Sequence, residues 1–286
     1  MKLHLALLAR LALLSGCAAV AAAAAQSNIT CSSGLFMIVA RGSSEAPGTG
    51  RIGVVAGNVS ELIPNSAIVA LDYPATFSAY VDSEGLGTAA MTAWIKAYVA
   101  ACPDGKISLI GYSQGGQVTA DTLCGTYDGQ YFARTPDLAD TYEQNIVAAI
   151  MFGDPSHNVS ASWNAGTSTQ NGLFPRQNLS ACDPYSSKMR SWCDTGDRYC
   201  AGGNNTLTHG TYFANYTMDA VNFIVQKYNE SLSAEPTATS SASASATVSS
   251  TASPSSVSGS SASFLTAPAA PWQHLFWLLF MYLAIS

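Results

Sequence analysis

The sequence predicts an α/β fold, with a doubly wound parallel sheet of about five strands inside a three-layer sandwich. Short apolar runs recur through the middle of the chain, and they are continuous rather than alternating. Such runs are typical of parallel strands that are buried on both faces. Segments with apolar residues at helical spacing separate them, and this alternation indicates a sheet that helices cover.

Four largely apolar segments are expected to form the buried strands. In chain order they are Leu35–Ala40, Ala67–Tyr73, Ile107–Tyr112 and Ile146–Gly153. In a doubly wound sheet with the order 2-1-3, the first strand lies beside both the second and the third.

Three segments between and after these runs are expected to form helices, because their apolar residues fall on one helical face. The residues on these faces are Val55, Val59 and Leu62; Met91, Trp94, Ile95, Tyr98 and Val99; and Val221, Ile224, Val225 and Tyr228.

Composition and charge narrow the function classes. The 286 residues suffice for one domain of about 200 residues with appendages. Hydrophobic residues make up 48% of the chain and charged residues 10%, which suits a compact core with a weakly charged surface. The formal net charge is −6, so we expect no surface for nucleic acid or another polyanion.

Residues 1–25 are expected to be a signal peptide, which leaves a folded domain at 26–230. Lys2 and Arg10 accompany an apolar stretch, and Ala23–Ala25 supplies a small-residue cleavage site. A bacterial lipoprotein box with Cys17 as the acylated residue is the alternative. The other end of the chain argues against it, because that end indicates a eukaryotic secretory route.

The C-terminal part is expected to be a linker followed by a lipid-attachment signal. Residues 231–260 are mostly Ser, Ala and Thr, a composition that cannot bury enough apolar area to fold. Residues 261–286 end in an apolar tail with no basic flank, which is typical of a GPI signal that is removed on maturation. A single membrane span is the alternative, although the apolar part, 275–285, is shorter than the ~20 residues that a span needs. Such a protein would be secreted and held by a GPI lipid anchor at the cell surface or cell wall.

Sequons and cysteines agree with export. Seven N-x-[ST] sequons predict a glycoprotein. Six cysteines remain outside the leader, and an even number in an oxidising compartment predicts three disulfides. Cys31 and Cys102 precede neighbouring strands and are expected to pair. Cys193 and Cys200 are expected to pair locally, which leaves Cys124 with Cys182. The chain has no C-x-x-C or matching histidine pair, so we expect no metal.

The segment Gly111–Gly115 fits the pattern G-x-S-x-G, with Ser113 at its centre. An expected strand precedes the motif and a helix-forming segment follows it, which is the context that a nucleophilic serine needs. The turn exposes the hydroxyl and aims the helix N-terminus at developing negative charge. A glycine-rich turn with an incidental serine is the alternative.

A nucleophilic serine needs a general base and an acid that orients it. Outside the two ends of the chain the histidines are His157 and His209. We favour His209, which comes just before the last helix, where the order Ser…Asp…His places the base. The acid could be Asp194 or Asp197, both in the loop that a Cys193–Cys200 disulfide would close, and spacing alone does not separate them. Asp154 and Asp183 are weaker candidates.

Five motifs, "ARGSSE", "GYSQGG", "GDPS", "CDTGDRYC" and "THGTYF", occur in this order. Together they resemble the cutinase and acetylxylan esterase family of secreted serine esterases, from about Cys31 to Tyr228. The resemblance implies a small α/β-hydrolase fold without a lid and a mechanism that uses no metal or organic cofactor. It also implies Ser113, Asp197 and His209 as the catalytic residues, with backbone N–H groups of Ser43 and Gln114 as the oxyanion hole.

Tyr112 and Tyr199 are expected to bind substrate, and Tyr199 matches a tyrosine of the acetylxylan esterases in this family. The expected substrate is a short acyl ester on plant polysaccharide such as acetylxylan, because the loop before His209 is polar. Arg198 departs from that pattern, since acetylxylan esterases often carry proline there. The alternatives are a cutinase acting on lipid-like polyesters, with Leu173, Phe174 and Phe213 as an apolar rim, and a non-catalytic GPI-anchored protein that binds wall glycans. We expect a monomer.

Overall fold

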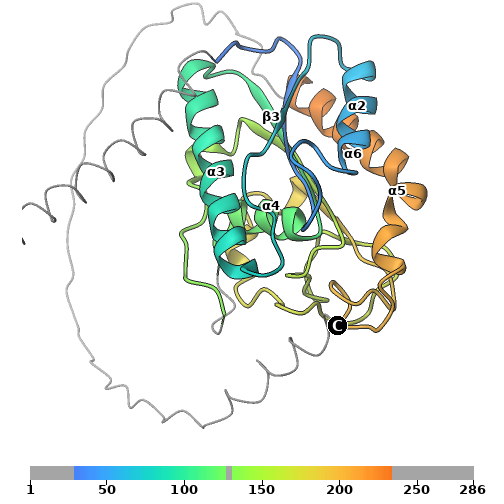
Figure 1. The fold of residues 1–286 in the computed structure, drawn as a ribbon. Helices are drawn as coiled ribbons and strands as arrows, with labels where there is room; N and C mark the ends of the chain where they lie inside the picture. The colour runs from blue at the N-terminus through green and yellow to red at the C-terminus, as the bar shows by residue number, and fades with distance from the viewer. Residues whose placement is uncertain (1–28, 127–130, 234–286) are drawn as a thin grey trace, which may run out of the picture. The chain divides into compact units, whose positions relative to one another are not determined.

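The structure is a computed structural model and describes residues 29–126 and 131–233 (Figure 1). The predicted signal peptide, the GPI signal and nearly all of the predicted linker lie outside the described residues. The last helix ends at Ser233, so it continues three residues past the expected end of the folded domain. In the described part of the chain, none of the helices combines the length and apolar character that crossing a bilayer requires.

A parallel sheet forms the centre of the molecule, with the strand order β2-β1-β3-β4-β6-β5. The strands are β1 (Leu35–Ala40), β2 (Ala67–Ala70), β3 (Lys106–Tyr112), β4 (Ile146–Phe152), β5 (Asn164–Ala165) and β6 (Met189–Trp192). The predicted order 2-1-3 is confirmed. The edge strand β5 and its neighbour β6 were not predicted, because neither forms a continuous apolar run.

Helices cover both faces of the sheet, as Figure 1 shows, with α2 and α6 on one side and α3 and α4 on the other. The helices are α2 (Gly53–Leu62), α3 (Tyr80–Ala101), α4 (Gln114–Cys124), α5 (Tyr212–Asn215) and α6 (Thr217–Ser233), with 3₁₀ turns η1 (Asp140–Tyr142), η2 (Ser180–Cys182), η3 (Ser186–Lys188) and η4 (Thr208–Gly210). Buried apolar side chains form one cluster on each side of the sheet. The α/β-hydrolase class predicted from the sequence is confirmed.

The prediction that Leu62 faces the core is wrong. The side chain shares a helical face with Val55 and Val59 in the sequence pattern, but it is 55% exposed. The helix ends at Leu62 and the chain turns to extended backbone at Ile63, which is buried instead. Helical periodicity no longer decides which side chain faces the core where the helix stops.

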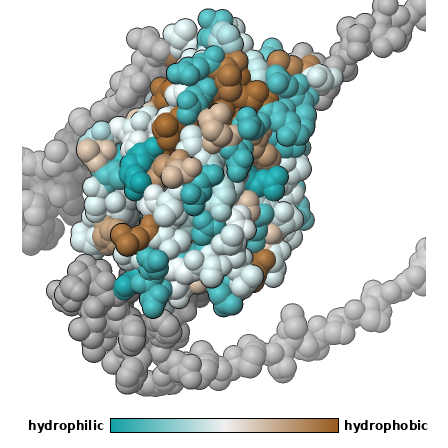
Figure 2. Space-filling view, turned by 90° about the vertical axis from the view of Figure 1, so that its right-hand side faces the viewer, coloured by the Kyte–Doolittle hydropathy of each residue, from teal (hydrophilic) through white to brown (hydrophobic). Residues whose placement is uncertain are grey.

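The face that carries α2, α5 and α6 is mostly polar, with apolar side chains gathered towards one end (Figure 2). The exposed apolar residues on these helices are Val54, Leu62, Met218 and Leu232.

The structure contains the three disulfides that the sequence predicts, Cys31–Cys102, Cys124–Cys182 and Cys193–Cys200. Cys31 precedes β1 and Cys102 precedes β3, so the first disulfide joins the starts of two adjacent strands. The third closes a loop with a sequence separation of only 7, directly after β6.

Candidate active site

Ser113 lies in the tight turn between β3 and α4. Its φ of 55° and ψ of −121° are strained for any residue except glycine, at a cost of about 1–3 kcal/mol. The flanking glycines allow this turn, because backbones touch there. A Cβ on Gly111 would lie 2.1 Å from Gly115 O, and a Cβ on Gly115 would lie 2.1 Å from Ala40 O. The turn therefore presents the hydroxyl at the carboxyl edge of the sheet, at the start of a helix.

His209 lies in η4, and its ring packs at the same edge of the sheet. An ideal Cβ on Gly153, the residue after β4, would lie 2.7 Å from His209 Cε1. The Ser113 N–H donates to Phe152 O at 2.8 Å, so the serine and Gly153 end neighbouring strands side by side. The structure thus brings His209 to the strand end next to Ser113. Among the described residues, its buried Nε2 has no hydrogen-bond partner.

Asp197 accepts a hydrogen bond from the other ring nitrogen, with 2.8 Å between His209 Nδ1 and Asp197 Oδ2. The carboxylate is fully buried. Its Oδ1 accepts the N–H groups of Tyr199 at 2.7 Å and Cys200 at 3.1 Å, and its Oδ2 also accepts the Tyr212 hydroxyl at 2.6 Å. Burial raises the pKa of Asp197, but the hydrogen bond and charge of His209 and the Tyr212 bond outweigh it, so the pKa lies below its usual value.

The other candidate residues do not reach this pair. Asp194 accepts hydrogen bonds from Thr167 and from the Tyr216 hydroxyl, not from His209. His157 is buried, and neither ring nitrogen has a partner in the part of the chain that the structure describes. Burial lowers the pKa of His157 to about 4, so the ring is neutral at physiological pH.

Two tyrosines pack against the His209 ring. The Tyr112 ring centroid is 5.1 Å from it and the Tyr199 centroid is 4.5 Å. The Tyr112 hydroxyl donates to His209 O at 3.0 Å, and its side chain is mostly buried. Tyr112 thus fixes the backbone of the histidine, while its role in binding substrate stays a prediction, as does that of Tyr199.

The predicted oxyanion-hole residues lie where the loop after β1 meets the start of α4. The Gln114 side chain is fully buried, and its Oε1 accepts the Ser83 hydroxyl at 2.9 Å. Its backbone N–H belongs to the first turn of α4, where amide groups have no acceptor within the helix. Ser43 follows β1, and its buried Oγ has no hydrogen-bond partner within residues 29–126 and 131–233. An ideal Cβ on Gly115 would lie 2.6 Å from Arg41 O, so the start of α4 and the loop after β1 are in close contact.

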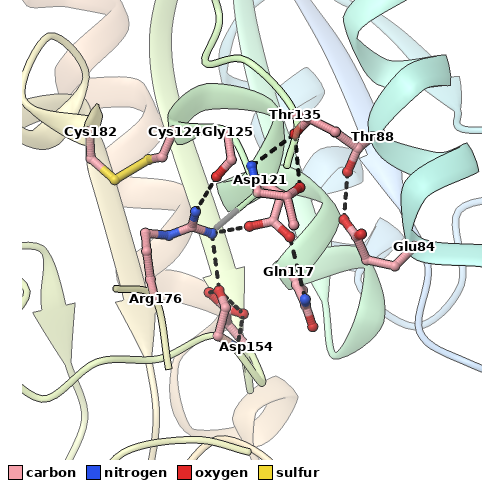
Figure 3. Close-up of polar contacts among 12 residues, drawn as sticks. Glu84, Thr88, Gln117, Asp121, Cys124, Gly125, Thr135, Asp154, Arg176 and Cys182 are labelled. Carbon is pink, nitrogen blue, oxygen red and sulfur yellow. Dashed lines mark hydrogen bonds and ion pairs between the residues drawn. A yellow bond between two sulfur atoms is a disulfide. The ribbon is translucent and has the colours of Figure 1, made fainter. Parts of the chain in front are cut away.

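A buried polar network joins α4, the helix that begins directly after Ser113, to neighbouring loops (Figure 3). Arg176 pairs with Asp121 of α4 and donates to Gly125 O at 2.6 Å and Ser156 Oγ at 3.2 Å. Ser156 in turn donates to Asp154, next to Gly153. Burial raises the pKa of Asp154 to about 6. One guanidinium therefore joins α4 to the loop after β4 that carries Gly153.

An aromatic chain continues from the site towards Phe174. Phe77 lies 6.0 Å from Tyr199 and 6.3 Å from Tyr80, and Tyr80 lies 5.6 Å from Phe174, all between ring centroids. Phe77 and Leu173 are exposed. Phe213, the other residue predicted for an apolar rim, instead packs on the Tyr112 and Arg51 side chains. Within the described part of the chain, no group of three His, Cys, Asp or Glu side chains is placed to hold a metal ion.

A strained serine between a parallel strand and a helix, with chain order Ser, Asp, His, is typical of α/β hydrolases, and this protein has that fold. Comparison with known proteins gives the particular group. The family model described as Cutinase matches residues 31–228, and the chain belongs to this family of carboxylic ester hydrolases.

Relatives of both kinds expected from the sequence occur. Acetylxylan esterase 2 of Talaromyces purpureogenus is 34% identical over 197 residues, which cover 66% of this chain and 84% of that protein. Cutinase 11 of Verticillium dahliae is 32% identical over 234 residues, which cover 79% of each. The catalytic core domain of acetyl xylan esterase from Trichoderma reesei superposes with a TM-score of 0.65 at 32% identity, over 69% of this chain and 100% of that one.

Sequence reasoning missed two residues of the site. Gly153, in "FGDPS", leaves the space that the His209 ring fills. Tyr212, three residues after His209 in "THGTYF", donates to Asp197. A glycine directly after an expected strand was a usable signal for the first. Nothing in the order of residues indicated the second.

Proposed function

We propose that the protein is a serine esterase that forms an acyl-enzyme on Ser113, with His209 as general base and Asp197 as the orienting acid. The observation that carries this proposal is the Asp197–His209 hydrogen bond of 2.8 Å, which leaves the Nε2 side of the ring without a partner at the strand end beside Ser113. A histidine held in this way has the tautomer and orientation that a serine nucleophile needs.

The proposed reaction has two half-reactions. His209 Nε2 removes the Ser113 proton as Oγ attacks the ester carbonyl, and the imidazolium is stabilised by the Asp197 carboxylate. Backbone N–H groups of Ser43 and Gln114 hold the oxyanion, and loss of one such donor costs about 3–4 kcal/mol in the transition state. His209 then protonates the leaving alcohol. Water repeats the cycle on the acyl-enzyme and releases the acid.

For the substrate, we propose short acyl esters on polysaccharide, such as acetylxylan. The loop before His209 exposes Asn204 and Asn205, which suits a hydrated carbohydrate, although Leu207 in the same loop is also exposed. Relatives named acetylxylan esterase in two organisms support this choice, at 34% and 33% identity.

Cutin is the second candidate. Exposed Phe77 and Leu173 favour it, because Phe77 belongs to the aromatic chain beside the site and Leu173 directly precedes Phe174 at the end of that chain. The relative named Cutinase 11 also supports it. A non-catalytic role in binding wall glycans is the third candidate, and the intact Ser, Asp and His set weighs against it.

Hydrolysis of p-nitrophenyl acetate and p-nitrophenyl palmitate, with acetate release from acetylated xylan, tests these candidates. We expect preference for acetate and release of acetate from xylan. Ser113→Ala should abolish both, whereas the matched control Ser187→Ala, at an exposed position, should leave them unchanged. Preference for palmitate supports cutin, and inactivity of the wild type on every ester supports the binding role. Activity in Ser113→Ala contradicts the mechanism.

We also propose that the enzyme is exported as a glycoprotein and held at the cell surface by a GPI anchor, on the composition of residues 1–25 and 231–286. A phosphatidylinositol-specific phospholipase should release active enzyme from intact cells. Retention of activity on the cells after treatment contradicts the anchor.

A further inference from the structure

We propose that Tyr212 is a positioning residue for catalysis: its hydroxyl holds the Asp197 carboxylate in place and keeps it available as an ionised partner for His209. This inference rests on the proposed catalytic roles of Asp197 and His209. Tyr212 begins α5 and is fully buried.

The Tyr212 hydroxyl binds the same oxygen as the histidine. It donates to Asp197 Oδ2 at 2.6 Å, and His209 Nδ1 lies 2.8 Å from that atom. The other oxygen, Oδ1, accepts two backbone N–H groups. An ionised carboxylate has about four lone-pair sites, so these four donors occupy it fully. Neither rotation of the carboxylate nor a move toward solvent is possible without losing one of them.

Tyr212 itself is held from several sides. Its hydroxyl accepts the Asp194 N–H at 3.1 Å, and its ring lies 5.9 Å from the Phe152 ring at the end of β4. Burial, followed by the charge of Asp197, raises the pKa of Tyr212 far above its usual value, so the hydroxyl remains a donor at every working pH. The acid is thereby joined to the same strand end that bounds the His209 ring.

The groups around Asp197 leave few other sources of pH dependence near it. The titratable side chains that face or interact with it are His209, Tyr212, Asp194, Tyr199, Tyr112 and His157. His157 stays neutral because burial lowers its pKa to about 4. Burial raises the pKa of Tyr112, which therefore stays protonated.

Removal of the Tyr212 hydroxyl takes one donor from Asp197 Oδ2 and makes the carboxylate more basic. The pKa of Asp197 then rises, and the more basic carboxylate also favours the protonated form of His209. Both effects inactivate the base at a higher pH, so the acid limb of the pH profile should move upward. A purely structural role would lower stability without moving that limb.

The experiment compares Tyr212→Phe with Tyr216→Phe. Tyr216 lies one turn further on and donates to a carboxylate outside the proposed triad, at 2.8 Å from Asp194 Oδ1. With p-nitrophenyl acetate, Tyr212→Phe should lower kcat about tenfold with little change in KM, and should raise the acid-limb midpoint by about one pH unit, as expected for loss of a hydrogen bond to a charged group. Tyr216→Phe should retain the wild-type kcat and acid limb.

A double variant separates action through Asp197 from general damage. In an Asp197→Asn background the carboxylate is gone, so Tyr212→Phe should reduce kcat no further. The inference is overturned by an unchanged acid limb in Tyr212→Phe, or by an equal loss of kcat in both backgrounds. If Ser113→Ala is inactive and Tyr212→Phe has the wild-type pH profile, this inference alone is refuted. If Ser113→Ala is active, the proposed function is refuted.

A second substitution covers the case in which Tyr212→Phe does not fold, since that change also leaves the Asp194 N–H unpaired. Site-specific replacement of Tyr212 by 3-fluorotyrosine keeps the ring and hydroxyl and makes the hydroxyl a stronger donor. The acid limb should then move to lower pH, and an unmoved limb overturns the inference.

Discussion

Loss of the Arg176 side chain should destabilise the fold far more than loss of an exposed ion pair. Arg176 and Asp121 are 4% and 3% exposed, and the guanidinium also binds Gly125 O and Ser156 Oγ. Arg176→Met leaves the Asp121 charge buried without its partner. Breaking a buried pair on one side costs about 3–5 kcal/mol. For a domain of this size, that loss lowers Tm by about 10 °C.

The matched control is Lys188→Met. Lys188 and Glu143 also form an ion pair, at 3.0 Å, but their side chains are 21% and 48% exposed. Its removal should cost no more than about 1 kcal/mol. Urea unfolding of enzyme with intact disulfides measures both. In Arg176→Met, the added change Asp121→Asn should restore part of the loss, because it removes the orphaned charge. A cost for Arg176→Met equal to that of the control would refute the reasoning.

Three further predictions concern the site and its support. Gly153→Ala should reduce kcat at least about tenfold, because the new Cβ meets the His209 ring and φ there is +63°; a folded variant with wild-type kcat contradicts this. Loss of the Cys31–Cys102 disulfide, with a sequence separation of 71, should cost about 4 kcal/mol of stability without changing kcat. Loss of the Cys193–Cys200 disulfide, with a sequence separation of 7, should cost only about 2.5 kcal/mol but should lower kcat. Equal effects of the two changes on kcat would show that the small loop does not position the acid. Burial raises the pKa of Asp154 from 3.8 to about 6, so the folded state retains a proton that the unfolded chain releases, and this group makes stability fall as pH rises through that window. Asp154→Asn should flatten that slope in urea unfolding, and a slope equal to the wild type contradicts the assignment.

The sequence predicted those parts of the fold that local pattern determines. Leu35–Ala40 is an unbroken apolar run, and β1 has these same bounds. Ser113 could be singled out because two glycines flank it after a strand, and the close backbone contacts at both glycines explain why. β6 was missed because Arg190 interrupts its apolar character within four residues.

Other features depend on contacts between distant segments and could not be predicted. Arg176 and Asp121 are separated by 55 positions, and neither residue sits in a pattern that indicates a partner. Asp194 and Asp197 share one small loop, and spacing alone left both open as the acid. The structure separates them by donor geometry, since His209 bonds to one and Tyr216 to the other.

Covalent labelling of Ser113 tests the central claim most directly. Diisopropyl fluorophosphate reacts with a serine only where a base activates the hydroxyl, so intact mass and peptide mapping should show one adduct on the wild-type enzyme, at Ser113, with loss of esterase activity in step. His209→Ala should remain unlabelled. Full inhibition with the adduct on another residue, or rapid labelling of Ser113 in His209→Ala, would contradict the account.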